Sequence, residues 1–83
     1  MSESTFQIHG NPMKILRISK GFTCSEIGEK INVSRNHISK CERNTRKLST
    51  QKSRLFLEAI EVTEEEAKEF IQVFGQEEVV RNN

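Results

Sequence analysis

The sequence has 83 residues, of which 34% are hydrophobic and 30% are charged, and its net charge is +1. A chain of this length buries one small hydrophobic core, so the composition indicates one globular domain and excludes two. No apolar run reaches the roughly 18 to 20 residues of a membrane helix, and the first ten residues lack the features of a secretory signal, so we expect no membrane contact and a cytoplasmic location. Two cysteines are too few to staple such a domain, so reduced thiols are expected.

The small net charge conceals an uneven distribution along the chain. Residues 13–54 contain eleven Lys and Arg against three Glu, a net charge of +8. Residues 55–83 contain eight Glu against one Lys and one Arg, a net charge of −6. The first part would attract a polyanion and the second would repel it. Charge alone leaves open the alternative that both parts are only solvated helix faces.

Apolar residues recur at spacings of three and four, which predicts an all-α fold with five helices. The first helix is expected to begin with Asn11 as N-cap and Pro12 at the first helical position, and to end near Gly21. The second begins at Thr23, because Thr23 and Glu26 have the spacing of a capping box. Before residue 11 no pattern is present, so residues 1–10 are expected to form a flexible tail.

The second helix is expected to end at Asn32, which tolerates the left-handed conformation of a tight exit. Ser34 then caps a third helix that extends to about Arg43 and buries Ile38 and Cys41. Polar and basic residues occupy its opposite stripe: Arg35, Asn36, Ser39, Lys40 and Arg43.

Two further helices follow the basic loop, and both begin at recognisable caps. Ser49 caps the fourth, whose apolar positions are Leu55, Phe56, Ala59 and Ile60. The fifth begins at the capping box Thr63–Glu66 and is expected to end at Gly75, so that residues 11–75 form the domain and residues 76–83 a frayed tail. Its apolar stripe consists of Ala67, Phe70, Ile71 and Phe74.

The second and third helices have the lengths and short connection of a DNA-binding helix-turn-helix unit. Gly28 lies inside the second helix, where Gly costs about 1 kcal/mol relative to Ala, so we expect a close helix crossing at this position. The alternative is an ordinary helical hairpin, in which the basic stripe of the third helix and the basic loop Asn44–Lys47 would both occur by chance. The pattern therefore favours DNA binding. The inward positions are Ile27, Ile31, Val33, Ile38 and Cys41.

A longer pattern extends from Met13 to Thr63 and carries a family resemblance. It includes Leu16-Arg17, Lys20-Gly21-Phe22-Thr23, Glu26-Ile27, Ile38-Ser39 and Glu42-Arg43-Asn44. With these residues the chain resembles the XRE helix-turn-helix family, which has the lambda-repressor-like DNA-binding fold. Residues 42–48 and 57–63 are most similar to the controller proteins of restriction–modification systems. Departures from the family pattern are Cys24 in place of Gln, Asn32 in place of Gly and Leu48 in place of Pro.

The resemblance implies a transcriptional regulator that binds palindromic operators in double-stranded DNA as a homodimer. For the controller subgroup it further implies activation and repression of the protein's own operon, with contacts to RNA polymerase. A phage- or plasmid-type XRE repressor shares most of the same positions and is the alternative. The resemblance also implies an ion pair between Arg17 and Glu42 and a dimer interface on the last helix. The residues of that interface would be Ala67, Phe70, Ile71 and Phe74.

Within this interpretation each polar residue receives a role. Arg35 is expected to read bases, because a guanidinium matches the N7 and O6 acceptors of guanine, and Asn36 and Lys40 follow on the same surface. For His37 a phosphate contact and packing at the helix edge remain equally open, and Lys52 and Arg54 are expected to be solvated. The candidates for the DNA backbone are Thr23, Cys24, Ser34, His37, Ser39, Arg43, Asn44, Thr45, Arg46 and Lys47.

Other classes of function fit the sequence less well. A zinc site would need Cys24, Cys41, His9 and His37, which lack the close pairs of structural zinc ligands, so no metal and no cofactor is expected. We expect no enzyme activity, because the chain has no phosphate-binding glycine loop and no nucleophile with a matching base. A protein-interaction module that uses the Glu-rich last helix remains an alternative.

Overall fold

The computed structural model describes the backbone of residues 6–81 and the side chains of residues 6–73, and this part of the chain contains α-helices and no strand. The helices are α1 (Gly10–Ser19), α2 (Cys24–Ile31), α3 (Arg35–Glu42), α4 (Thr50–Ile60) and α5 (Glu64–Arg81). The predicted all-α fold with five helices is confirmed. None of the described helices is long and apolar enough to cross a membrane.

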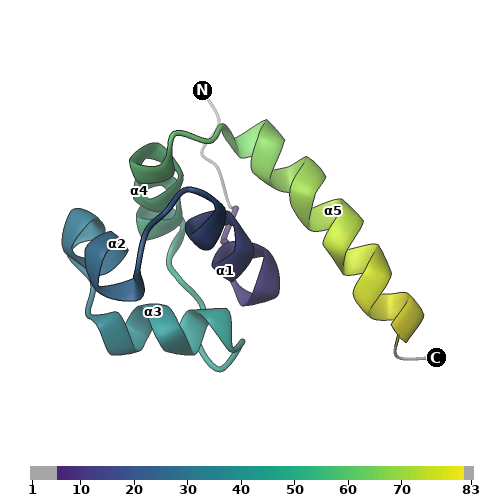
Figure 1. Cartoon of the computed structure of the whole chain (residues 1–83), viewed down its shortest axis with the longest axis horizontal. Helices are drawn as coiled ribbons and strands as arrows, with labels where there is room; N and C mark the ends of the chain where they lie inside the picture. Colours follow the sequence, from purple (N-terminus) through teal and green to yellow (C-terminus); the bar gives the residue numbers. More distant parts are fainter. Residues whose placement is uncertain (1–5, 82–83) are drawn as a thin grey trace.

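Helix α1 lies between the other helices, and the remaining four surround it (Figure 1). Helix α2 packs against α3 and α4, and α1 packs against α3 and α5. In Figure 1, α3 lies along the lower edge of the domain, α4 lies at the opposite edge and α5 is outermost. This arrangement leaves the outer side of α3 open to solvent.

The core receives side chains from every helix and from the segment before α1. Phe56 is its largest fully buried member, and Ile8 is buried completely although it precedes the first helix. The buried apolar residues are Ile8, Met13, Leu16, Ile27, Ile31, Ile38, Cys41, Leu48, Phe56, Leu57, Ile60 and Ala67.

Side-chain caps fix the starts of four helices. At α2 the hydroxyl of Thr23 accepts from the Glu26 amide at 3.0 Å, and the Glu26 carboxylate accepts from the Thr23 amide at 2.9 Å. The same reciprocal pair begins α5 between Thr63 and Glu66. Hydroxyl caps begin α3 at Ser34 and α4 at Ser49. Each cap satisfies an amide that has no partner within the helix, and these predictions are confirmed.

The beginning of the chain differs from the prediction. Helix α1 begins at Gly10, its N-cap is His9, and no side chain caps it, so the prediction of Asn11 as N-cap is wrong. Residues 6–10 are not a flexible tail, because Ile8 is buried and its amide donates to the Ser53 hydroxyl at 3.0 Å. A single buried Ile gives no periodic signal, which is why the pattern of the sequence missed it. Residues 1–5 lie outside the described residues.

Two predictions further along the chain are also wrong. The apolar positions expected on the fourth helix included Leu55, which is 36% exposed, and omitted Leu57, which is buried in the core. Helix α5 does not end at Gly75 but continues to Arg81. A glycine lowers helix stability by about 1 kcal/mol, which weakens a helix without terminating it when the flanking residues favour helix.

Candidate nucleic-acid interface

The turn between α2 and α3 is tight and depends on two residues. Asn32 adopts the left-handed conformation with φ of 62°, and the Val33 amide donates to the Gly28 carbonyl at 2.8 Å. A Cβ atom on Gly28 would lie 2.4 Å from the Val33 carbonyl oxygen. Gly28 is therefore needed, although the obstacle is the backbone of the turn and not the body of the crossing helix.

Helix α3 separates its residues into a buried and an exposed side. Ile38 and Cys41 are fully buried, whereas the residues expected to read bases, Arg35, Asn36 and Lys40, are exposed. Of the residues expected on the DNA backbone, Ser34 and Arg43 are exposed and His37 and Ser39 are half-buried. The side of α3 that faces solvent thus carries one Arg and one Lys, and a second Arg follows at its C-cap, with polar residues between them.

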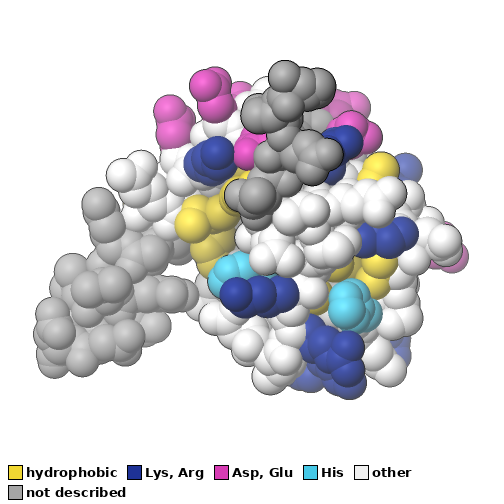
Figure 2. Space-filling model, turned by 180° about the vertical axis from the view of Figure 1, so that it is seen from behind, with side chains coloured by type: hydrophobic (Ala, Val, Ile, Leu, Met, Phe, Trp, Pro, Cys, Tyr) yellow, Lys and Arg dark blue, Asp and Glu magenta, His cyan; other side chains and the backbone are white. Residues whose placement is uncertain are grey.

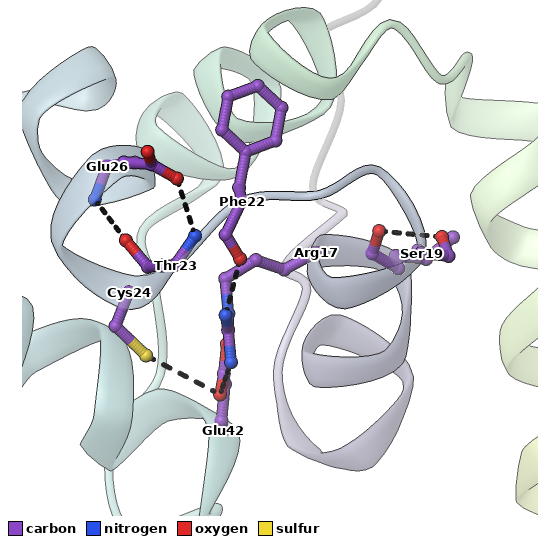
Figure 3. Close-up of polar contacts among 8 residues, drawn as sticks. Arg17, Ser19, Phe22, Thr23, Cys24, Glu26 and Glu42 are labelled. Carbon is purple, nitrogen blue, oxygen red and sulfur yellow. Dashed lines mark hydrogen bonds and ion pairs between the residues drawn. The ribbon is translucent and has the colours of Figure 1, made fainter.

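A buried ion pair attaches α3 to α1. Arg17 Nε lies 2.6 Å from Glu42 Oε2, Arg17 Nη2 donates to Glu42 Oε1 at 3.1 Å, and both side chains are less than 10% exposed (Figure 3). Arg17 Nη1 also donates to the Phe22 carbonyl at 2.6 Å, so the same guanidinium holds the loop before α2. The hydrogen bond to Glu42 raises the pKa of Arg17 further above its usual range. The structure thus joins the two residues that the resemblance implied as a pair.

Cys24 turns toward this pair. Its Sγ lies 3.9 Å from Glu42 Oε1, and the residue is half-buried at the start of α2 (Figure 3). The pKa of the Cys24 thiol is raised above its usual value, mainly because the thiol is partly buried. The thiol therefore supports the carboxylate of Glu42, a contact that no local pattern in the sequence indicates.

The loop after α3 carries the remaining basic residues. Asn44 has a left-handed φ of 68°, and Thr45 Oγ1 donates to the Lys40 carbonyl at 3.0 Å. Arg46 and Lys47 are exposed, and the loop then returns to the core at Leu48, which is fully buried. Its shape places the two cations beyond the end of α3.

Residues before α1 support this loop, and sequence reasoning missed them. Gln7 Nε2 donates to the Leu48 carbonyl at 3.1 Å, and His9 Nδ1 lies 2.7 Å from Asn44 Oδ1. These contacts join residues about 35 to 41 positions apart, so no local pattern in the sequence could have indicated them.

Two basic residues on α4 behave differently from each other. Arg54 is exposed, as predicted. Lys52 is half-buried, and its Nζ donates to the Ile31 carbonyl at 2.9 Å, so the prediction of a solvated Lys52 is wrong. A Lys side chain near a helix C-terminus donates to a carbonyl that has no partner within the helix, and its positive charge interacts favourably with the negative end of the helix dipole. Lys52 therefore supports the end of α2, next to the turn.

The charge division of the sequence is visible on the surface. On the face that Figure 2 shows, Glu side chains gather along the upper edge and the largest group of Lys and Arg lies along the lower edge. The lower edge is the one at which α3 lies in Figure 1. A polyanion that approached this edge would meet α3 and its following loop first.

The remaining candidate residues lie apart from this surface. On α5, Ala67 is buried and Phe70 and Ile71 pack half-buried against the domain's own core, whereas the Phe74 side chain lies outside the described residues. Both cysteines are free thiols, and His, Cys and Glu side chains of the described residues form no group of three that could hold a metal ion.

Comparison with known proteins gives one match. Residues 13–66, more than half of the chain, match the helix-turn-helix family. The matched segment begins in α1, includes the ion pair, the turn and the basic loop, and ends in the first turn of α5. No curated protein matches the chain, and no solved structure matches it.

Proposed function

Since the chain belongs to the XRE-type helix-turn-helix family of DNA-binding transcriptional regulators, we propose that it binds a palindromic operator as a homodimer and controls the operon of a restriction–modification system. The matched domain is a regulatory and not a catalytic one. The observation that carries the proposal is the division of α3, because the helix exposes Arg35, Asn36 and Lys40 while its other side is anchored in the core.

In the proposed complex α3 enters the major groove. Arg35 reads guanine, because its guanidinium donates to two acceptors at once, and Asn36 and Lys40 contact neighbouring base edges. The contacts to the DNA backbone come from both ends of the helix-turn-helix unit and from the loop after α3. They fix the position of the protein along the DNA without reading its sequence. These contacts use Thr23, Cys24, Ser34, His37, Ser39, Arg43, Asn44, Thr45, Arg46 and Lys47.

Helix α5 forms the proposed dimer interface. Ala67 is fully buried in the domain's own core, and Phe70 and Ile71 pack half-buried against that core, but Val73 is 55% exposed and the helix extends to Arg81. A second copy would cover this apolar surface and place two recognition helices about 34 Å apart, one helical turn of DNA. Phe74→Glu is then expected to give a folded monomer with weak operator binding, as seen by sedimentation. A wild-type protein that sediments as a monomer at micromolar concentration would contradict the dimer.

The controller function adds a regulatory sequence to this complex. One dimer near the promoter recruits RNA polymerase, and a second dimer on an adjacent site blocks it as the protein accumulates. The distribution of charge is compatible with this scheme, since the acidic part of the chain stays free for protein contacts while the basic part faces DNA.

A titration on the DNA upstream of the protein's own gene tests the controller function. Two successive shifted species, with transcription that first rises and then falls, are expected. A single shifted species with a steady fall in transcription would identify a phage- or plasmid-type XRE repressor. If no shifted protein–DNA species formed at physiological salt, the alternative function of a protein-interaction module would be favoured.

A further inference from the structure

We propose that a hollow between the start of α1 and the end of α3 binds a phosphodiester group of the DNA backbone, with Lys14 as its principal cation. The inference rests on the proposed DNA binding and adds a site on α1, a helix to which no DNA contact has been assigned so far. The hollow, called here the α1–α3 hollow, has a volume of about 460 Å³. Its lining includes Asn11, Lys14, Ser39, Glu42, Arg43 and Asn44.

The charge of the α1–α3 hollow favours an anion. Lys14 on α1 and Arg43 at the end of α3 are both exposed, and among the described residues neither of them forms an ion pair. The carboxylate of Glu42 also borders the hollow, but Arg17 binds both of its oxygens. Two cations therefore border the hollow, and its one carboxylate is already neutralised.

Polar side chains complete the lining. The hydroxyl of Ser39 can donate to a phosphate oxygen. The Asn44 amide is oriented by His9, whose Nδ1 lies 2.7 Å from its Oδ1. A phosphodiester carries one negative charge and only acceptor oxygens in its charged group, so donors and cations on both sides of a hollow are the chemistry that recognises it.

The position of the hollow relative to α3 fits the path of a DNA strand. Arg35 and Ser39 are four residues apart on one side of α3, and Arg43 follows four residues later at its C-cap. The hollow borders Ser39 and Arg43. A helix of 8 residues is about 12 Å long, close to the major-groove width of about 12 Å. When the start of α3 reaches base edges, the strand that borders the groove passes near its end, where the hollow opens.

The test compares Lys14 of α1 with Lys20, the residue that follows the end of α1. Lys14→Gln removes the cation at the hollow, and Lys20→Gln is the matched control, because Lys20 is exposed at the C-cap of α1 and does not line the hollow. Binding of each protein to a cognate and to a random duplex is measured as a function of salt concentration. Loss of one phosphate contact reduces the slope of log K against log salt by about 0.9, which corresponds to an affinity about fivefold lower at 0.15 M salt.

We expect this reduction for Lys14→Gln on both duplexes and no change of slope for Lys20→Gln. Both substitutions are on the surface, so the melting temperature of the free proteins should stay unchanged. If the slope for Lys14→Gln equals that of the wild type, the hollow does not bind phosphate, although the protein still binds DNA. If the wild type binds neither duplex, the proposed function is wrong and the hollow with it.

A second measurement locates the contact. Single backbone phosphates of the cognate duplex are replaced by neutral methylphosphonates, one linkage at a time. We expect one linkage in each half-site whose neutralisation weakens the wild type about fivefold and leaves Lys14→Gln unaffected. Equal losses for the two proteins at every linkage would show that Lys14 acts without a specific phosphate partner.

Discussion

Arg17 binds Glu42 through two parallel hydrogen bonds, from Nε to Oε2 at 2.6 Å and from Nη2 to Oε1 at 3.1 Å. The pair connects α1 to the last residue of α3. Arg17 makes a third hydrogen bond, to the Phe22 carbonyl, which attaches the loop before α2 to the same side chain. The guanidinium of Arg17 therefore holds α3, which carries the proposed interface, against α1. The orientation of α3 depends on this contact.

Glu42→Gln is expected to destabilise the fold by about 3 to 5 kcal/mol, because it leaves the charge of Arg17 buried without its counter-charge. The measurement is the free energy of unfolding in urea, together with the melting temperature. Glu29→Gln is the matched control, since Glu29 is exposed on α2 and no ion pair is formed by it among the described residues. Equal stability of Glu42→Gln and the wild type would show that the pair does not hold α3.

Gly28→Ala is expected to destabilise the protein, although the same change at an ordinary helix position stabilises by about 1 kcal/mol. The added Cβ would lie 2.4 Å from the Val33 carbonyl oxygen, so the turn between α2 and α3 would have to shift. Ser25→Ala, at an exposed position of the same helix, serves as the control and should be tolerated. A more stable Gly28→Ala protein in urea unfolding would mean that the turn adapts without cost.

Ile8→Ala is expected to cost about 2 to 5 kcal/mol, the usual range for truncation of a fully buried Ile. Ile18→Ala makes the same chemical change where the side chain is 53% exposed, and should have a small effect. The comparison of the two unfolding free energies measures how much the segment before α1 contributes to the core. Similar values for both variants would indicate that this segment is dispensable.

The two thiols give a pH dependence with a definite sign. Burial raises the pKa of Cys24 and of Cys41 above the usual 9.0. Between the usual and the raised pKa the unfolded chain loses thiol protons that the folded chain keeps, so the thiol contribution to stability is complete below about pH 9 and declines as the pH rises further. Urea unfolding of the wild type and of Cys24→Ala across this range should show a weaker decline for the variant. Parallel pH profiles would contradict the prediction.

Local signals in the sequence were sufficient for most of the fold. The capping boxes at Thr23 and Thr63 could be predicted because each is complete within four residues and satisfies amides of its own helix. The left-handed exit at Asn32 could be predicted for the same reason. Gly75 misled the prediction, because a local breaker weakens a helix without ending it.

Tertiary contacts explain what the sequence left undetermined. Leu55 and Leu57 are both apolar, and only the packing of α4 decides that Leu57 is buried and Leu55 is exposed. Lys52 donates to the carbonyl of Ile31, which is 21 positions away in the sequence, and Gln7 donates to the carbonyl of Leu48, which is 41 positions away. At such separations the spacing of residues in the sequence does not predict a contact. At the candidate site, the exposed stripe of α3 followed from helical periodicity, whereas the pairing of Arg17 with Glu42 came from the family resemblance and from the position of Glu42 as a lone carboxylate among cations.

Sequence-specific binding by α3 depends most on Arg35 as a reader of bases. Arg35→Ala should weaken binding to the cognate operator by about 1 to 3 kcal/mol and have much less effect on random DNA, because a base contact contributes only where the correct base is present. Lys47→Ala is the comparison. It should weaken both duplexes alike and reduce the salt slope by about one, as expected for a phosphate contact.

The most direct measurement is therefore the ratio of cognate to random-duplex affinity for the wild type and for Arg35→Ala at one salt concentration. We expect a ratio well above one for the wild type, and a ratio about 5- to 150-fold lower for the variant, the equivalent of about 1 to 3 kcal/mol. An unchanged ratio, with equal losses of affinity on both duplexes, would show that Arg35 contacts phosphate and that α3 does not read the operator through it.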